Sequence, residues 1–350
     1  MLSIINQIKH FSKKSPTPVS LKYLFEYGRE YDQEKILTQS QFLHQELPIR
    51  IAKRIINLQK LPYELNKFAG MQEIHDNYVK SFEKLSKTKY PKDINDCNNY
   101  VDLLNDLKSN HSDVEFRIAN CINSFKNTHR NYEEYSDVIN SRLRTFYDSR
   151  IGIRFLAGQH IELKNQNVSD NNIGLIFNLN LDTILNNAIN ETKTIMSQKY
   201  MNLPEIKVSV QDPKKIVYLP NHLHYILFEV LKNSVEATIK NNSLKSVEVK
   251  CIHNKNGVNI SITDYGGGFK FEDKNKVFSF LYTTNNYRDD IMNNMIPVSG
   301  FGFGLGMSKL YVEYFGGQIH IMPLENHGTT VFINLNSLVN NGKHIADLKY

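Results

Sequence analysis

A stripe of polar residues on an otherwise apolar helix is the first feature that could support chemistry. Hydrophobic periodicity predicts a helix over Asn221–Lys240, which begins after Pro220. Glu229, Asn233 and Glu236 are spaced four and three residues apart and therefore share one face of it. Two carboxylates and an amide in line could hold a hydrated cation and polarise a water molecule. A solvated polar face is the simpler interpretation of such a stripe.

An acidic residue followed by glycines is the second feature. Asp264 comes directly after an apolar strand predicted over Val258–Thr263, and glycines occupy positions 266 to 268. Glycine has no Cβ, so the backbone can approach a flat ligand closely. The carboxylate could then accept a hydrogen bond from an amine on a purine ring. A hairpin or loop with a supporting Asp is the alternative interpretation.

Alternating glycines form the third feature. Residues 299–306 read SGFGFGLG, and a helix is predicted to follow over Met307–Phe315. Free backbone N–H groups at a helix start, together with the helix dipole, would attract phosphate groups. Such a run is often only a linker, but here it follows the other two features in a fixed order. Gly328 and Thr329, which open a strand predicted over Thr330–Leu335, complete the series.

The elements that must position these residues fall into two regions. From about residue 171, helical stretches alternate with β-like runs, which is typical of an α+β or α/β domain. The predicted strands are Ile206–Val210, Ser246–Ile252, Val258–Thr263, Gln318–Met322 and Thr330–Leu335. Residues 17 to about 165 instead have helical periodicity and almost no glycine. They predict a bundle of about four helices, with Pro48 interrupting one helix.

Positive charge is concentrated at the N-terminus. Lys and Arg exceed Asp and Glu by 42 − 36 = 6, and four of the lysines precede the first acid, Glu26. The remaining sequence is close to neutral, so nucleic-acid binding is not expected. Residues 1–16 could form the basic amphipathic helix typical of a mitochondrial targeting segment. A frayed first helix with chance lysines is the alternative.

Two further classes of site lack support in the sequence. The three cysteines are widely scattered and form no CxxC pair, so neither a zinc site nor a disulfide framework is expected. No apolar run reaches the roughly 18–20 residues that a membrane-spanning helix needs, so no transmembrane segment is expected.

The ordered motifs resemble those of known ATP-binding proteins. The acid-and-amide helix, the DYGGG segment, the glycine run and the Gly-Thr strand resemble the ATP-binding domain shared by DNA gyrase B, Hsp90, histidine kinases and MutL. Four segments of the N-terminal half are similar to mitochondrial pyruvate dehydrogenase kinase and branched-chain 2-oxo-acid dehydrogenase kinase. These segments are FLHQELPIRI at 42–51, NYVKS at 77–81, HSDV at 111–114 and FYDSRIGIRFLAGQH at 146–160. The resemblance covers roughly residues 20–337.

This resemblance implies a fold and a domain organisation. The fold class is α+β, with an N-terminal four-helix-bundle-like domain followed by a GHKL-type α/β sandwich that binds ATP. The expected segments are a mitochondrial targeting segment at 1–16, a helical regulatory and docking domain at 17–168, the ATP-binding kinase domain at 169–337 and a tail at 338–350.

The resemblance also assigns roles to residues, with ATP and Mg²⁺ as cofactors. Glu229 would be the general base that activates a substrate serine, Asn233 would bind Mg²⁺, and Asp264 would bind the adenine amine. The remaining residues expected around ATP are Glu236, Gly266, Gly268, Thr283, Thr284, Gly300, Phe301, Gly302, Phe303, Gly304, Leu305 and Thr329.

A second site is implied in the helical half. Tyr78, Ser81, His111 and Arg150 match positions that line an allosteric 2-oxo-acid pocket in the family. Arg150 would be the carboxylate partner in that pocket. Simple helix packing with surface charges is the alternative interpretation of this group.

The implied function is that of a mitochondrial matrix protein serine kinase. It would phosphorylate and inactivate the E1 component of a 2-oxo-acid dehydrogenase, with the E1 alpha subunit of pyruvate dehydrogenase favoured and the branched-chain enzyme as the alternative. It would dock on the E2 lipoyl domain as a homodimer. A histidine kinase is a further alternative. So is a non-catalytic ATP-gated binding protein, because Tyr265 and Glu236 stand where the family usually carries arginine.

Overall fold

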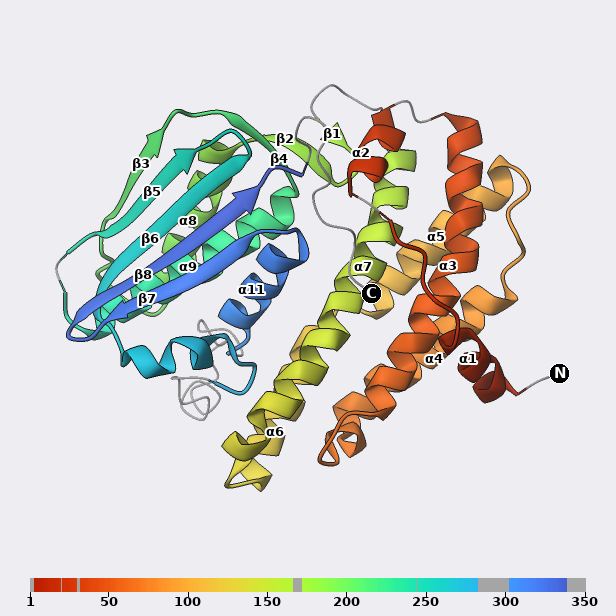
Figure 1. Cartoon of the computed structure of the whole chain (residues 1–350), viewed down its shortest axis with the longest axis horizontal. Coiled ribbons are helices and arrows are strands. Elements are labelled where there is room, and N and C mark those ends of the chain that lie inside the picture. Colours follow the sequence, from red (N-terminus) through yellow and green to blue (C-terminus); the bar gives the residue numbers. More distant parts are fainter. Residues whose placement is uncertain are drawn as a thin grey trace. The chain divides into compact units, whose positions relative to one another are not determined.

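The computed structural model describes residues 3–19, 21–29, 32–165, 172–243, 245–282 and 302–338 (Figure 1). The chain forms two compact units, the first ending at Leu175 and the second beginning at Ile176. The first is almost entirely helical, and the second combines helices with a sheet. The predicted α+β fold class, with a helical region preceding an α/β domain, is therefore confirmed.

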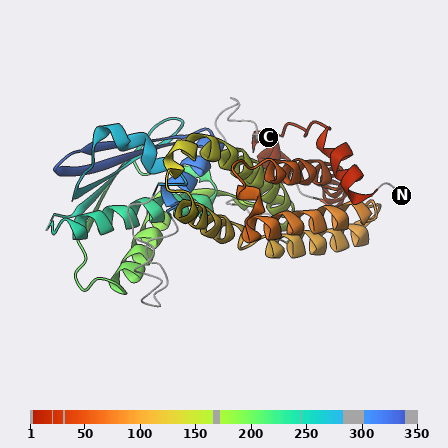
Figure 2. The same cartoon turned by 90° about the horizontal axis from the view of Figure 1, so that it is seen from below.

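The long helices of the first unit lie side by side (Figure 2). The core contains fully buried residues from several of them, including Leu43, Phe82, Phe125 and Leu156. Helices α3, α4, α5 and α7 pack around this core, α6 packs on α4, and α1 packs on α3. The bounds are α1 Ile4–Ser12, α2 Leu21–Arg29, α3 Gln33–Gln59, α4 Ala69–Lys87, α5 Ile94–Asn110, α6 Val114–Thr128 and α7 Ser136–Asn165, with 3-10 turns η1 Leu65–Lys67 and η2 Tyr132–Tyr135 and the short strand β1 Asn172–Ile173.

Pro48 does not interrupt its helix. The prediction of a break was wrong, because α3 continues through Pro48 from Gln33 to Gln59. Proline inside a helix removes one backbone hydrogen bond and destabilises the helix by about 3 kcal/mol. Leu47 and Ile51 on either side are buried, and each buried aliphatic side chain contributes about 1.5–3 kcal/mol. Packing along α3 therefore outweighs the lost hydrogen bond.

A five-stranded sheet with the order β3-β5-β6-β8-β7 dominates the second unit. β3 and β5 are parallel, whereas the other neighbouring strands are antiparallel. Helices α8 and α9 lie on one face of this sheet (Figure 2), and α11 packs on α9. The bounds are β2 Ile176–Asn180, α8 Leu181–Ser197, β3 Ile206–Gln211, β4 Lys215–Tyr218, α9 Pro220–Lys240, β5 Val247–His253, β6 Gly257–Gly267, the 3-10 helix η3 Phe271–Phe278, α11 Gly304–Tyr314, β7 Gln318–Leu324 and β8 His327–Asn336.

Alternating burial fixes which side of each strand faces the helices. In β6 the side chains of Val258, Ile260 and Ile262 are buried, while the residues between them are more exposed. The same alternation in β5 and β8 extends this apolar layer, with β5 packing on α9 and β8 on α11. This packing places the polar stripe of α9 beside the end of β6.

Strand β6 extends further than the sequence predicts. The expected end at Thr263 was wrong, because β6 continues to Gly267 and Asp264 pairs with Thr329 of β8. The register shifts between Asp264 and Gly267, which is a β-bulge or similar irregularity. Such a shift redirects side chains at a strand end, and the Asp264 carboxyl group accepts backbone hydrogen bonds there.

Candidate functional site

One cavity in the second unit gathers most of the residues that the three sequence motifs single out. Its volume is about 350 Å³, within the range of roughly 300–1,000 Å³ that is usual for small-molecule sites. Ten of the predicted ATP-site residues line it, namely Glu229, Asn233, Glu236, Asp264, Gly266, Gly268, Gly302, Gly304, Leu305 and Thr329. The acid-and-amide helix, the end of β6 and the start of α11 are thus brought to one place.

Five predicted ATP-site residues are not seen at this cavity. Thr283, Thr284, Gly300 and Phe301 lie outside the described residues. Phe303 is described but does not line the cavity. Its ring packs edge-on against Phe280 with the ring centroids 5.2 Å apart, so it stabilises the segment that leads into α11.

Asp264 is buried and held by backbone groups. Only 5% of its surface is exposed, and its Oδ1 accepts hydrogen bonds from the N–H groups of Gly266 at 2.9 Å and Thr329 at 3.2 Å. Burial raises the pKa of Asp264 to about 6, although these backbone bonds and one from Ser234 act in the opposite direction. The carboxyl group therefore has a fixed orientation at the cavity wall.

Glu229 is paired with a lysine that the sequence analysis did not single out. Lys232 Nζ donates to Glu229 Oε2 at 2.7 Å, and both side chains are buried. The ammonium also lies 5.2 Å from the centroid of the Phe228 ring. The spacing of three residues on one helix was the available signal for this pair. The ion pair fixes the direction of the Glu229 carboxylate within the cavity wall.

The start of α11 approaches Glu229 directly. A Cβ placed on Gly304 would collide with Glu229 Oε2, so no side chain fits at this position. The N-cap residue, Phe303, makes no side-chain capping bond, and the first N–H groups of a helix have no partner within it. Because Gly302, Gly304 and Leu305 line the cavity, the positive end of α11 lies at its wall and could bind phosphate.

The glycines after Asp264 allow close packing between elements. A Cβ on Gly266 would meet Ala237 of α9 at 2.5 Å, and one on Gly268 would collide with the Leu324 carbonyl oxygen. Gly267 and Gly268 also have positive φ angles of 82° and 63°, which glycine adopts readily. From the sequence, these glycines are expected to let the backbone approach a ligand. In the structure they let it approach α9 and the β7–β8 turn.

The last acid of the α9 stripe already has cationic partners. Glu236 Oε1 lies 3.1 Å from Lys240 Nζ and 3.8 Å from Lys199 Nζ, and it accepts a hydrogen bond from the Tyr200 hydroxyl at 3.3 Å. Asn233, half-buried between the two acids along the stripe, offers an amide to the cavity. The negative charges of Glu229 and Glu236 are thus neutralised by lysines, and Asn233 is the uncharged residue of the stripe.

The residues present fit a magnesium–phosphate group. Among the described residues no group of three or more His, Cys, Asp or Glu side chains could hold a metal ion. Magnesium commonly uses only one or two protein ligands and completes its shell with water and phosphate oxygens. Asn233 and Glu229 lie on the same cavity wall as the start of α11, which matches that requirement.

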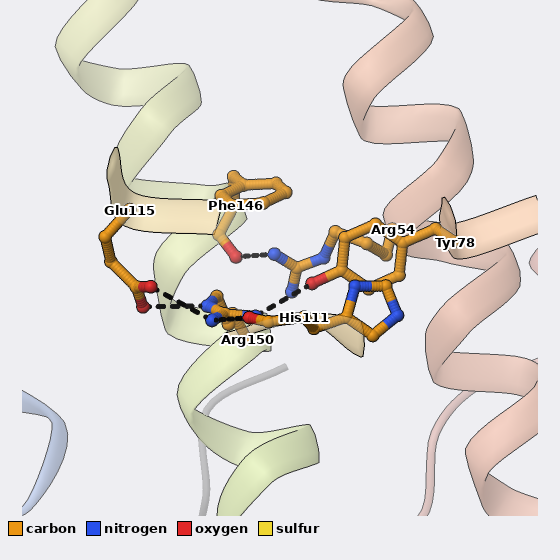
Figure 3. A network of polar contacts seen from close by, with 6 residues as sticks. All are labelled: Arg54, Tyr78, His111, Glu115, Phe146 and Arg150. Carbon is orange, nitrogen blue, oxygen red and sulfur yellow. Dashed lines mark hydrogen bonds and ion pairs between the residues drawn. The ribbon is translucent and has the colours of Figure 1, made fainter. Parts of the chain in front are cut away.

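The four residues of the implied allosteric site lie together in the first unit, and Figure 3 shows Tyr78, His111 and Arg150 among them. The His111 ring stacks on Tyr78 with centroids 4.2 Å apart, and His111 Nε2 lies 2.8 Å from the Ser81 hydroxyl. Burial, followed by the charge of Arg150, lowers the pKa of His111 to about 4. Tyr78, His111 and Arg150 border a small cavity of about 50 Å³, otherwise lined largely by aliphatic side chains.

Comparisons with known protein families match both units. The sequence model of a family described as "Mitochondrial branched-chain alpha-ketoacid dehydrogenase kinase" matches residues 18–177. That of "Histidine kinase-, DNA gyrase B-, and HSP90-like ATPase" matches residues 218–338. None of the helices among the described residues is long and apolar enough to cross a membrane.

Several relatives are similar along almost the whole chain. The mitochondrial [pyruvate dehydrogenase (acetyl-transferring)] kinase of Arabidopsis thaliana is 31% identical over 96% of this chain and 94% of its own length. Isozyme 4 of that kinase from Homo sapiens is 32% identical over 95% of this chain and 84% of its own length. Isozyme 3 from Homo sapiens is 30% identical, with 95% and 86% covered. The resemblance inferred from the motifs is thus confirmed. The ATPase domain is of the histidine kinase, DNA gyrase B and HSP90 type, and the chain belongs to the mitochondrial pyruvate dehydrogenase kinase family of protein kinases.

Proposed function

We propose that this chain transfers the terminal phosphoryl group of ATP to a serine of the E1 alpha subunit of pyruvate dehydrogenase and so inactivates that enzyme. The observation that carries the proposal is the single cavity where Glu229, Asp264 and the start of α11 meet. The relatives named above are pyruvate dehydrogenase kinases, which favours pyruvate dehydrogenase over the branched-chain enzyme.

Asp264, the start of α11 and the residues around them would bind ATP. Asp264, held by two backbone N–H groups, accepts a hydrogen bond from the adenine amine, with Thr329 beside it. The N–H groups at the start of α11 bind the phosphates, with Gly302, Gly304 and Leu305 closing over them. Gly300, Phe301, Phe303, Thr283 and Thr284 belong to the same proposed nucleotide site, with Gly266 and Gly268 shaping its floor and Glu236 anchoring its lysines.

Phosphoryl transfer depends mainly on positioning and charge neutralisation. Asn233 would hold Mg²⁺, which when bound neutralises charge on the phosphates. Glu229 is the general base that accepts the proton of the serine hydroxyl. The Lys232 ion pair orients its carboxylate, and the glycine at 304 leaves that carboxylate in reach of the phosphate-binding helix start.

Radiolabelled ATP and Mg²⁺ with purified E1 from the pyruvate and the branched-chain complexes test this proposal. Glu229→Gln should reduce acid-stable labelling of E1 by roughly 10²–10⁴-fold and leave ATP binding in place. Glu205→Gln, the same change at an exposed carboxylate of the second unit, is the control. Unchanged transfer in Glu229→Gln would exclude the base role, and acid-labile phosphate on the chain itself would favour a histidine kinase.

The branched-chain enzyme is the second candidate substrate. The family description that matches the helical unit names the branched-chain kinase, so both E1 proteins belong in the assay. A faster initial rate with branched-chain E1 would reassign the substrate without affecting the roles given to Glu229 and Asp264.

The partners and location follow the same proposal. The face of the sheet away from α9 carries exposed apolar side chains at Ile252, Met322, Leu324 and Phe332, which supports a homodimer formed through the second unit. Docking on the E2 lipoyl domain and residence in the mitochondrial matrix are proposed from the family. In the helical unit, Tyr78, Ser81, His111 and Arg150 are proposed to form an effector pocket for small 2-oxo acids.

A further inference from the structure

The Arg150 guanidinium is already bound by a carboxylate of this chain. Arg150 Nε donates to Glu115 Oε1 at 2.9 Å, and Nη2 donates to Glu115 Oε2 at 3.1 Å (Figure 3). Nη2 also donates to the His111 carbonyl oxygen at 2.6 Å, and Nη1 to the Tyr78 hydroxyl at 3.3 Å. Two-point contact between a planar guanidinium and a carboxylate is the geometry that an external carboxylate would adopt.

The two partners differ in their access to water. The Arg150 side chain is 3% exposed, whereas that of Glu115 is 38% exposed. Glu115 lies in the first turn of α6, so its carboxylate reaches Arg150 from the surface. A partly exposed side chain can rotate into solvent without unfolding its helix, whereas Arg150 cannot leave the bundle. Glu115 is therefore the displaceable member of the pair.

A second buried arginine increases the positive charge beside this pair. Arg54 is fully buried, and its Nη1 donates to the Phe146 carbonyl oxygen while Nε and Nη2 have no hydrogen-bond partner. Its guanidinium lies 4.2 Å from the Phe146 ring centroid. Burial lowers the pKa of Arg54 to about 10, so it stays charged at neutral pH. Among the six residues of Figure 3, Glu115 carries the one carboxylate and pairs with Arg150, while Arg54 adds a second positive charge nearby.

We propose that Glu115 is a built-in competitor for the effector pocket, and that small monocarboxylates bind only when they displace its carboxylate from Arg150. The inference rests on the proposed effector pocket and assigns its regulation. A monocarboxylate with a short apolar chain fits because aliphatic residues, among them Leu47, Ile51 and Leu104, line the cavity beside Arg150. The cavity of about 50 Å³ has room for only a few atoms, so an effector carboxylate must take the position that the Glu115 carboxylate holds on Arg150.

This competition has a definite effect on affinity. The apparent dissociation constant equals the intrinsic constant divided by the fraction of molecules in which the pocket is free. If Glu115 leaves Arg150 in one molecule out of about ten, the effector binds about tenfold more weakly than to a pocket that is always free. Removing the carboxylate also leaves the buried Arg150 guanidinium without its ion-pair partner, which favours an external anion further.

Calorimetric titration of pyruvate into the full-length chain, without E1 or ATP, tests the inference. Glu115→Gln should bind pyruvate at least about tenfold more tightly than the unmodified chain. Asp113→Asn removes the same charge from the same helix start, but its carboxylate pairs with Arg117 at 2.7 Å, so its affinity should equal that of the unmodified chain. Glu115→Ala replaces Glu115→Gln if the latter does not fold by circular dichroism.

The gain must depend on Arg150. In Glu115→Gln with Arg150→Met, which removes both members of the pair, the tighter binding should disappear. Equal affinity of the unmodified chain and Glu115→Gln, an equal gain in Asp113→Asn, or no pyruvate binding by a folded Glu115→Gln would each overturn the inference. These titrations are independent of phosphate transfer to E1, so failure of the proposed kinase function would appear in a different experiment.

Discussion

At the scale of single residues, the acidic side chains that line the cavity form hydrogen bonds and ion pairs with the protein in place of contacts with water. Asp264 is held by backbone N–H groups, Glu229 by Lys232, and Glu236 by two lysines. The backbone partners of Asp264 could not be deduced from the sequence, because they depend on how β6 and β8 pair. Lys232 and Lys240 lie three and four residues after their acids, so helical spacing was the available signal for those two pairs. The α9 stripe could be predicted because helical spacing determines which residues share a face.

Asp264→Asn should separate stability from function. Its pKa is raised in the folded chain, so its favourable contribution is present below the ordinary pKa of Asp and is lost as pH rises through about 6. The amide can still accept the two backbone bonds without burying a charge. We expect stability at pH 8 to rise by roughly 1–3 kcal/mol. ATP binding should be lost, because the amide oxygen is used by the two backbone N–H groups and the amide NH2, a donor, would then face the adenine amine.

Thermal unfolding and ATP titration at pH 5 and pH 8 check this prediction. The unmodified chain should bind ATP more weakly at pH 5 than at pH 8, because protonation of Asp264 removes the charged acceptor. Retained ATP affinity in Asp264→Asn would contradict the role assigned to this residue.

Gly304→Ala should strongly reduce phosphate transfer. The added methyl group would collide with the Glu229 carboxylate, so either the base or the start of α11 must move. A displacement of about 1 Å in an active site reduces rates by roughly 10²-fold. Gly306→Ala, where the nearest atom would be 3.0 Å away, should lose less activity. Initial rates of E1 labelling compare the two variants, and equal rates would argue against this contact.

At the scale of elements, pattern and packing contribute differently. The strands β5, β6 and β8 could be predicted because their buried residues alternate along the sequence. β2 and β4 were not predicted, since the sequence of β2, IFNLN, does not alternate strictly and the four residues of β4 are too few for a clear period. The predicted break at Pro48 was wrong, because the burial of side chains along α3 stabilises the helix by more than the proline destabilises it. The Glu115–Arg150 pair joins residues 35 positions apart, a distance at which no local pattern exists.

The first helix is a test of how far packing extends. In α1, Ile8 is 4% exposed and Ile5 is 60% exposed, and the Phe11 ring packs edge-on against Phe82 at 5.5 Å. Ile8→Ala should therefore lower the free energy of unfolding by about 2–4 kcal/mol, whereas Ile5→Ala should change it by less than about 0.5 kcal/mol. Urea denaturation of the full-length chain measures both. Equal effects would show that α1 does not pack on the bundle in solution.

At the scale of the whole molecule, two units divide the work. The second unit contains the proposed nucleotide site, and the first contains the proposed effector pocket. Both fold classes could be predicted from the change in glycine content and periodicity near residue 171. The sheet order could not, because it depends on which strands pair and not on any one strand.

The apolar face of the sheet away from α9 predicts the oligomeric state. Met322 and Leu324 in β7 are both more than half exposed. Replacing both by Lys should convert a dimer to a monomer in sedimentation velocity, because like charges would then meet across the interface. Tyr23→Lys, at an exposed apolar side chain of the first unit, should leave the dimer intact. An unmodified chain that sediments as a monomer would exclude the proposed homodimer.

The packing of α1 on α3 also constrains the biogenesis of this protein. If residues 1–16 act as an import signal, the same apolar side chains that hold α1 on the bundle must first be available to the translocation machinery. A fully folded precursor would hide Ile8, so recognition has to precede completion of the helical unit. Slower folding of that unit would then lengthen the period of import competence, and any protease that removes the segment afterwards would release a less stable mature enzyme.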